Sequence, residues 1–128
     1  MSQLDEYKRS KLHYLCIDYP EGDRVRILKE LVESGEDVNL KDKNGWSPLH
    51  FAAQEGDSII AKELIDLGAD IAAAECNGNT PLWVATMNSN SSNKLIHVLL
   101  EAGADPDKEN NHGVSPMEIS PELFKNGI

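Results

Sequence analysis

The stretch NGWSPLHFAAQEGD, residues 44–57, contains the signals that decide the fold of this chain. Asn44 and Gly45 are typical of a tight turn. Ser47 stands before Pro48, a pair that marks a helix start, because the hydroxyl accepts from free backbone N–H groups and proline lacks one. Glycine tolerates the left-handed conformation of a helix end, so Gly56 is expected to terminate the helix. The stretch therefore predicts a turn followed by one short helix.

The same pattern returns twice along the chain, as NGNTPLWVAT from residue 77 and HGVSPMEIS from residue 112. The turn glycines Gly45, Gly78 and Gly113 are spaced 33 and then 35 residues apart. A second glycine signal keeps these spacings, in ESGEDVN from residue 33, DLGADIA from residue 66 and EAGADPD from residue 101. A fixed period in this range is the signature of a protein built from stacked repeats.

Each unit also contains a second apolar segment of helical period. The segments are RVRILKELVESG from residue 24, DSIIAKELIDLG from residue 57 and NKLIHVLLEAG from residue 93. In the middle segment the apolar residues include Ile59, Ile60 and Leu64, which we expect to form one buried stripe. The repeating unit is predicted to be turn, helix, helix and loop.

Together these motifs resemble the ankyrin repeat, a β-turn plus two helices with the motif T-P-L-H-x-A at a 33-residue period. SPLHFAA matches this motif with Ser47 in place of threonine, and TPLWVAT matches it with Trp83 in place of histidine. The resemblance covers about residues 12–120. It implies an all-α solenoid of helix-turn-helix units joined by β-turn or hairpin loops.

We expect a single domain over residues 1–128, with full repeats at 44–76 and 77–111 between a cap repeat at 1–43 and a truncated cap at 112–128. The first unit keeps Leu12 and His13 but has no turn and no Ser/Thr-Pro pair before them. Extra polar residues in MNSNSSNK, from residue 87, predict a longer, mobile loop in the second full repeat. Pro121 limits the first helix of the last unit to a turn or two.

Composition and charge narrow the functional classes. The chain is 40% apolar and carries a formal net charge of −10, all of which arises within residues 31–128. This acidic character disfavours a nucleic-acid partner and favours a basic protein partner. The sequence shows neither an apolar run of membrane-spanning length nor a secretory signal, so we expect a cytoplasmic protein away from membranes. The cysteines, Cys16 and Cys76, are expected to be reduced.

Motifs for catalysis, cofactors and metals are absent from the sequence, so we predict no enzyme, no cofactor and no metal site. The ankyrin resemblance implies that His13 and His50 hydrogen-bond the backbone of neighbouring turns. His97 is expected on the solvent side of its helix and His112 in a turn. Cys16 stands where the repeat has a core alanine, and Cys76 is expected to be exposed near a turn.

The resemblance also implies a partner-binding surface on the concave side of the stack, formed by turn tips and first helices. The candidates at the turns are Lys43, Asn44, Trp46, Asn77, Asn79, His112 and Val114. The candidates on the first helices are Gln54, Glu55, Met87 and Asn88. One further position of the repeat lies between the histidine and the alanine pair. In the four units it is occupied by Tyr14, Phe51, Val84 and Ile119, which form a candidate apolar series. Alternatively, this position is half buried between repeats.

Trp46 stands out among these candidates. Tryptophan is enriched at binding hot spots, and a turn tip offers no core for the ring to enter. Truncation of Trp46 is therefore expected to weaken partner binding with little loss of stability. The alternative is that the ring lies across the next turn.

The leading functional hypothesis is a protein–protein interaction module without catalysis, monomeric when free. In its sharper form, a small, acidic, free-standing ankyrin protein looks like a bacterial immunity protein that neutralises a basic, nuclease-like toxin. The alternative is a regulatory or adaptor subunit that docks on a cellular enzyme or transcription factor. A hydrolase assembled from residues distant in sequence has no motif in its support. The sequence leaves open whether the concave face, the 88–93 loop or the C-terminal tail binds.

Overall fold

The computed structural model describes residues 6–18, 23–88 and 93–125 of the chain, and within these ranges it contains eight helices and no strand. The helices follow one another in pairs. These are α1 (Lys11–Asp18) with α2 (Arg24–Glu33), α3 (Pro48–Glu55) with α4 (Ser58–Asp66), α5 (Pro81–Met87) with α6 (Asn93–Glu101), and α7 (Pro116–Ile119) with α8 (Glu122–Lys125). The predicted all-helical fold is confirmed.

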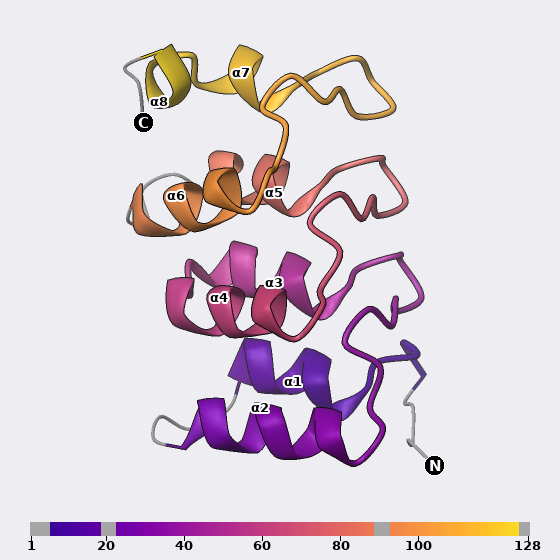
Figure 1. The fold of residues 1–128 in the computed structure, drawn as a ribbon. Helices are drawn as coiled ribbons and strands as arrows, with labels where there is room; N and C mark the ends of the chain where they lie inside the picture. Colours follow the sequence, from indigo (N-terminus) through magenta and orange to yellow (C-terminus); the bar gives the residue numbers. More distant parts are fainter. Residues whose placement is uncertain (1–5, 19–22, 89–92, 126–128) are drawn as a thin grey trace.

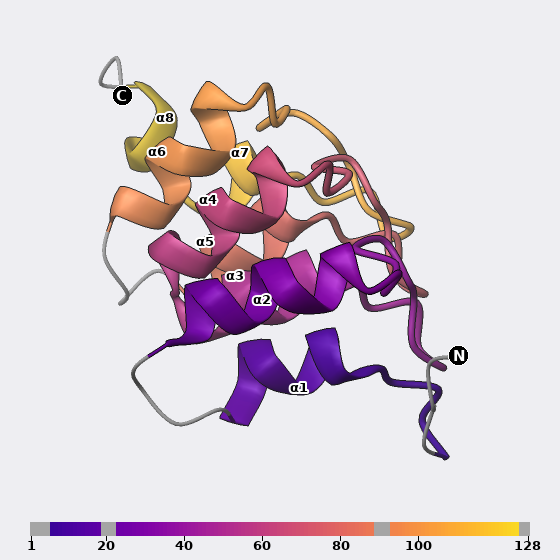
Figure 2. The same cartoon turned by 60° about the horizontal axis from the view of Figure 1, so that its bottom comes forward.

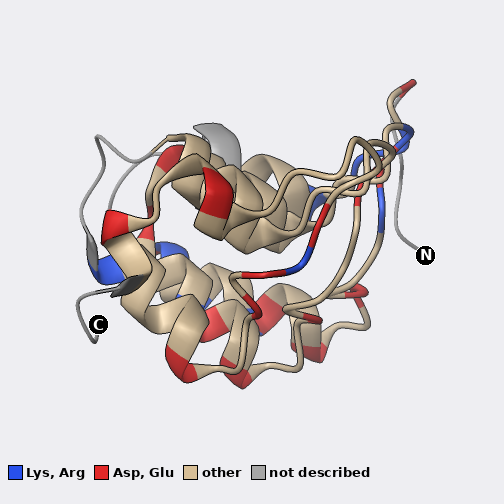
Figure 3. Ribbon diagram, turned by 90° about the horizontal axis from the view of Figure 1, so that it is seen from above, with Lys and Arg blue, Asp and Glu red and all other residues tan. Residues whose placement is uncertain are grey.

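The helix pairs stack one on the next from the N-terminus to the C-terminus, and the connections between pairs project from one side of the stack (Figure 1). The inner helices α1, α3, α5 and α7 contact one another in that order, and the outer helices α2, α4 and α6 do the same. The turned view shows α2, α4 and α6 as a row in front of α3, α5 and α7, with α1 beside α2 (Figure 2). The view from above shows the two layers and the projecting turns edge-on (Figure 3).

The inner helices begin at the residues that the sequence predicts. Ser47, Thr80 and Ser115 each accept, through the side-chain oxygen, the backbone N–H of the third residue on. A proline follows each of them at the start of the helix. Gly56 ends α3 in the left-handed conformation, with φ 70°. Short-range signals therefore account for where these helices start and for the end of α3.

The core follows the seam between the two helix rows. Its largest fully buried apolar side chains are Leu12, Leu15, Leu28, Leu49, Ile60, Leu64, Leu82, Leu95 and Leu99. Ala52 and Ala53 are also fully buried, which lets neighbouring helices approach α3 closely. The predicted stripe on α4 is wrong at Ile59, which is 66% exposed. Ile60 and Leu64, four residues apart, face the core instead, because only one side of a helix can do so.

The first unit is a closer copy of the others than its sequence indicates. The backbone N–H and Oγ of Ser10 lie 3.0 and 3.1 Å from Nδ1 of His13. Ser47 makes the same two contacts with His50 at the start of α3. Ser10 therefore stands in the place of Ser47, although the Ser/Thr-Pro pair is absent here because Lys11 occupies the position of the proline.

A turn also precedes α1, contrary to the sequence prediction. Lys8 has φ 59° and is the one non-glycine residue with positive φ in the described parts of the chain. Gly45 and Gly78 take this conformation at the corresponding positions, with φ 82° and 80°. The carbonyl of Tyr7 accepts the backbone N–H of Lys43 at 2.6 Å, which joins this turn to the next. A residue with a Cβ pays about 1–2 kcal/mol for the left-handed conformation.

Two further expectations concern the second half of the stack. The helices α7 and α8 are short and separated at Pro121, as predicted. The predicted longer loop of the second full repeat falls mainly on residues 89–92, which lie outside the described residues.

Candidate functional site

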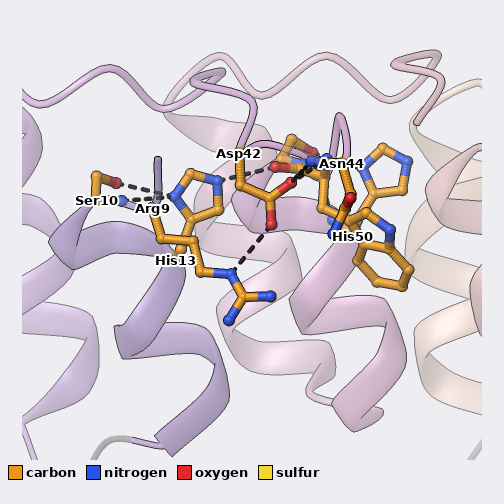
Figure 4. Close-up of polar contacts among 8 residues, drawn as sticks. Arg9, Ser10, His13, Asp42, Asn44 and His50 are labelled. Atoms are coloured by element: carbon orange, nitrogen blue, oxygen red, sulfur yellow. Dashed lines mark hydrogen bonds and ion pairs between the residues drawn. The ribbon is translucent and has the colours of Figure 1, made fainter. Parts of the chain in front are cut away.

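Three turns, at residues 42–46, 75–79 and 110–114, are each organised by one polar side chain that the sequence analysis did not predict. The buried carboxylate of Asp42 accepts the backbone N–H groups of Asn44 and Trp46, both at 2.9 Å (Figure 4). Glu75 and Asn110 accept, in the next two turns, from the residues two and four positions on. The three side chains recur at the spacings of the turn glycines, and that periodicity is the signal that identifies them.

The histidines tie each helix to the following turn, as the sequence predicts. Nδ1 of His50 accepts the backbone N–H of Ser47 at 3.1 Å, and its Nε2 lies 2.8 Å from the carbonyl oxygen of Asn79. This arrangement requires the neutral tautomer with the proton on Nε2. Nε2 of His13 lies 2.9 Å from the carbonyl oxygen of Trp46 in the same way.

Trp83 takes over the histidine's role in the next unit. Its indole N–H donates to the carbonyl oxygen of Val114 at 3.2 Å. The backbones of successive turns are also joined directly, since the N–H of Cys76 donates to the carbonyl oxygen of Asn44 at 3.0 Å. The turns therefore form a hydrogen-bonded row that holds their exposed side chains in a defined order.

The buried histidines make stability depend on pH. Burial lowers the pKa of both His13 and His50 from the ordinary value of 6.5, although the hydrogen bonds to backbone carbonyls oppose the shift. The unfolded chain therefore binds protons at higher pH than the folded chain. The stabilisation is complete above about pH 6.5 and declines as the pH falls below it. We expect urea titrations to give a lower free energy of unfolding at about pH 5.5 than at about pH 7.5.

A double variant serves as the control for this dependence. His13→Gln with His50→Gln keeps polar side chains but removes both titrating groups. It should unfold with a much flatter pH profile between these two values. An equally steep profile in the double variant would assign the pH dependence to other groups.

Many predicted partner-binding residues lie on the surface formed by the turn tips and the exposed sides of the inner helices, here called the inner face. The exposed candidates are Lys43, Asn44, Gln54, Glu55, Asn77, Met87 and His112. The half-exposed candidates are Trp46, Asn88, Val114 and Ile119. Met87 is the most prominent apolar residue among them, at 54% exposure. That a partner contacts these residues stays a prediction.

Three of the predicted contact residues are buried. Phe51 is 6%, Val84 is 4% and Asn79 is 8% exposed. The Asn79 side-chain oxygen accepts from Asn110 across to the next turn, and the two apolar residues belong to the core. The proposed apolar series is therefore interrupted in the middle, and the alternative reading, burial between repeats, holds for Phe51 and Val84. Tyr14 remains exposed.

The premise that the Trp46 ring has no core to enter is wrong. Trp46 is half buried and packs against the core. Its ring centroid lies 4.9 Å from that of Phe51 and 5.5 Å from that of His50. Truncation of Trp46 would remove this packing, so a loss of stability is now expected alongside any loss of binding.

Negative charge is concentrated on the outer helices and the loops that follow them (Figure 3). The exposed acids there are Asp23, Glu30, Glu33, Asp37, Asp66, Asp70, Glu101, Asp105, Asp107 and Glu109. Residues 6–14 and 40–47, which include the first two turns, instead carry five bases and two acids, a balance of +3. One of those acids, Asp42, has a fully buried side chain that pairs with Arg9 at 3.1 Å. The local charge at this end of the inner face is therefore positive, although the net charge of the whole chain is negative.

The described residues contain neither a reactive buried thiol nor a cluster of metal ligands. Burial raises the pKa of the Cys16 thiol to about 12, so the thiolate nucleophile is scarce at neutral pH. Groups of three or more His, Cys, Asp or Glu placed to hold a metal ion do not occur in ranges 6–18, 23–88 and 93–125. Within the same ranges the helices are too short or too polar to cross a membrane.

Comparisons with known proteins agree with this architecture. A family model of ankyrin repeats, in three copies, matches residues 12–110. The chain is 30% identical over 94 residues to human ankyrin repeat and SOCS box protein 3, which is 73% of the chain and 18% of that relative. It is 30% identical over 117 residues to the human transient receptor potential cation channel subfamily A member 1, 91% of the chain and 10% of the relative.

A shorter match is closer in sequence. Thirty-two residues are 53% identical to mouse protein phosphatase 1 regulatory subunit 12A, covering 25% of the chain and 3% of that protein. The chain thus spans only a small part of each of these relatives.

Proposed function

The chain belongs to the ankyrin-repeat family, and from that premise we propose that it binds a partner protein through its inner face, without catalysis of its own. Ankyrin repeats are protein-interaction repeats, and stacked repeats form extended binding surfaces. The observation that carries the assignment to the inner face is the hydrogen-bonded row of turns. It fixes exposed side chains such as Asn44, Asn77 and His112 on a pre-organised surface, which lowers the entropic cost of binding.

The favoured role is that of a regulatory or adaptor module that docks on another protein. Two of the relatives support it by name, a phosphatase regulatory subunit and an ankyrin protein with a SOCS box. The chain matches only a small part of either relative. The two names therefore support docking on a protein, but they do not indicate which protein is bound. The inner face suits docking, since it combines amide side chains with an exposed apolar residue, Met87.

A second candidate is neutralisation of a basic, nuclease-like toxin in the cytoplasm. The acidic outer helices favour it, because a basic protein would be attracted to exposed carboxylates such as Glu33, Asp66 and Glu101. These three residues stand at the C-terminal ends of α2, α4 and α6, where a negative charge opposes the helix dipole. In this case the outer helices, and not the inner face, would form the interface.

One binding experiment separates the two candidates. The partner is captured with the wild-type chain, and its affinity for two variants is then measured by calorimetry. Gln54→Arg with Met87→Arg places bulky charges on the inner face at exposed positions. We expect this variant to bind about tenfold more weakly or worse, a loss of about 1.4 kcal/mol, with an unchanged melting temperature.

The second variant, Glu33→Lys with Asp66→Lys and Glu101→Lys, changes only the outer helices. Full affinity in this variant is expected if the inner face binds. Loss of affinity here, with full affinity in the inner-face variant, would move the interface to the outer helices and favour the basic partner.

A further inference from the structure

The N-terminal end of the inner face carries a cluster of aromatic and basic residues, exposed except for the half-buried Arg9, and most of them are not among the predicted contact residues. It consists of Tyr7, Lys8, Arg9, Lys11, Tyr14 and Lys43 and is here called the N-terminal patch. The turn before α1 supplies Tyr7, Lys8 and Arg9, and α1 itself supplies Lys11 and Tyr14. The bond between the Lys43 N–H and the Tyr7 carbonyl oxygen places the next turn against them.

Arg9 holds the two tyrosines of the patch in place. Its guanidinium carbon lies 4.9 Å from the centre of the Tyr7 ring and 5.9 Å from that of Tyr14. Its Nε donates to the buried carboxylate of Asp42 at 3.1 Å (Figure 4). The tyrosines nevertheless remain 45% and 38% exposed. Tyrosine and arginine are enriched at the centres of protein interfaces, and here they are already ordered before any partner arrives.

The backbone of Lys8 is a second, independent observation. The lysine occupies a left-handed turn position that Gly45 and Gly78 fill in later units. Glycine at this position would relieve the strain, so the fold alone gives no reason for a lysine. Residues with strained backbone conformations concentrate at functional sites, where the function of the side chain requires the residue in spite of the strain. The feature that lysine adds at this exposed position is a positive charge.

Charge identifies the class of ligand. Residues 6–14 and 40–47 balance to +3, while the whole chain carries −10. An acidic segment would be repelled by the outer helices and attracted to this end of the inner face. Lys8, Lys11 and Lys43 would meet its carboxylates, while the exposed tyrosine rings would contact an apolar side chain beside them.

We propose that the N-terminal patch binds an extended acidic segment of the partner protein, in which Asp or Glu residues flank an aromatic or aliphatic side chain. This inference rests on the proposed function, since it names the chemistry of the partner at one end of the inner face. The net charge of the chain alone favours a basic partner, whereas the charge of the N-terminal patch favours an acidic one.

Selection from a random-peptide display library on the immobilised wild-type chain tests the proposal. The enriched peptides should be rich in Asp and Glu next to one large apolar residue. Synthetic peptides of the enriched sequence should bind Lys8→Glu with Lys43→Glu about tenfold more weakly or worse. A matched variant, Lys62→Glu with Lys94→Glu, makes the same change of charge on the outer helices and should keep full affinity. Thermal melts verify that both variants fold.

The outcomes distinguish this proposal from the proposed function. Peptides that lack an excess of acids, or that keep their affinity for the Lys8/Lys43 variant and lose it with Gln54→Arg and Met87→Arg, would overturn the acidic ligand but retain the inner face. A library that yields no binding peptide at all would overturn the acidic-segment proposal, while the capture experiment with Gln54→Arg and Met87→Arg would still test the inner face.

Two alternative occupants have their own readouts. A fluorescein-labelled oligothymidylate that binds more tightly than the peptides and depends on Lys8 and Lys43 would make the ligand a nucleic acid. Sedimentation that shows a dimer of the wild-type chain at low salt, abolished in the Lys8/Lys43 variant, would make the occupant the acidic face of a second copy. Either result would overturn the proposal.

Discussion

Substitution of Asp42 by alanine is expected to lower the free energy of unfolding by about 3 kcal/mol. The carboxylate is fully buried, accepts two backbone N–H groups of its turn and pairs with Arg9. Its removal leaves those part-buried donors without their acceptor and deprives Arg9 of the carboxylate beside it. The expected loss lies at the lower end for a broken buried pair because the Arg9 side chain is still 23% exposed. Urea titration with a fluorescence readout measures it.

Asp42→Asn divides this loss into its parts. Asn110 already organises the last turn through an amide oxygen, so an asparagine at residue 42 should keep both backbone hydrogen bonds. The stability that Asp42→Asn still loses then reports the ion pair with Arg9. Asp42→Ala with wild-type stability would show that water replaces the carboxylate without loss, and the carboxylate would then not organise the turn.

Leu49→Ala is expected to cost about 2–5 kcal/mol, the range for a large cavity in a well-packed core. Leu49 is 1% exposed and lies on α3, which packs against both α1 and α5. A cavity there weakens two interfaces between neighbouring pairs, and a short stack has few others to compensate. Thermal and urea unfolding of the variant measure the loss.

Ile59→Ala is the matched control, since it also truncates a large aliphatic side chain. Ile59 is exposed on α4, so its truncation should change stability by no more than about 0.5 kcal/mol. Equal losses in the two variants would contradict the assignment of α3 to the centre of the core.

The local features of the fold were predictable because they depend on residues close together in the chain. The Ser/Thr-Pro pairs mark helix starts and Gly56 marks a helix end. The turn before α1 was missed for the same reason, since its local signals are altered. Lys8 replaces the glycine and Lys11 the proline, and the contacts that hold the turn come from Lys43 and Asp42 in the next unit.

The candidate site was predicted in outline but not residue by residue. The exposure of Gln54, Glu55 and Met87 on the inner helices is what the ankyrin resemblance implies, and the structure exposes them. The burial of Phe51 and Val84 depends on how closely the next unit packs against each of them. No motif within a single unit carries that information.

The sequence by itself determined that this chain is a stack of turn–helix–helix units, because a periodic pattern of caps, glycines and apolar residues favours one local structure in every copy. Only the tertiary structure decided what each copy presents to solvent. Trp46 lies against Phe51 and His50, and the Asp42 side chain is buried beneath its own turn, where it pairs with Arg9. Burial and surface charge are set by contacts between units, and the period of the sequence does not encode them.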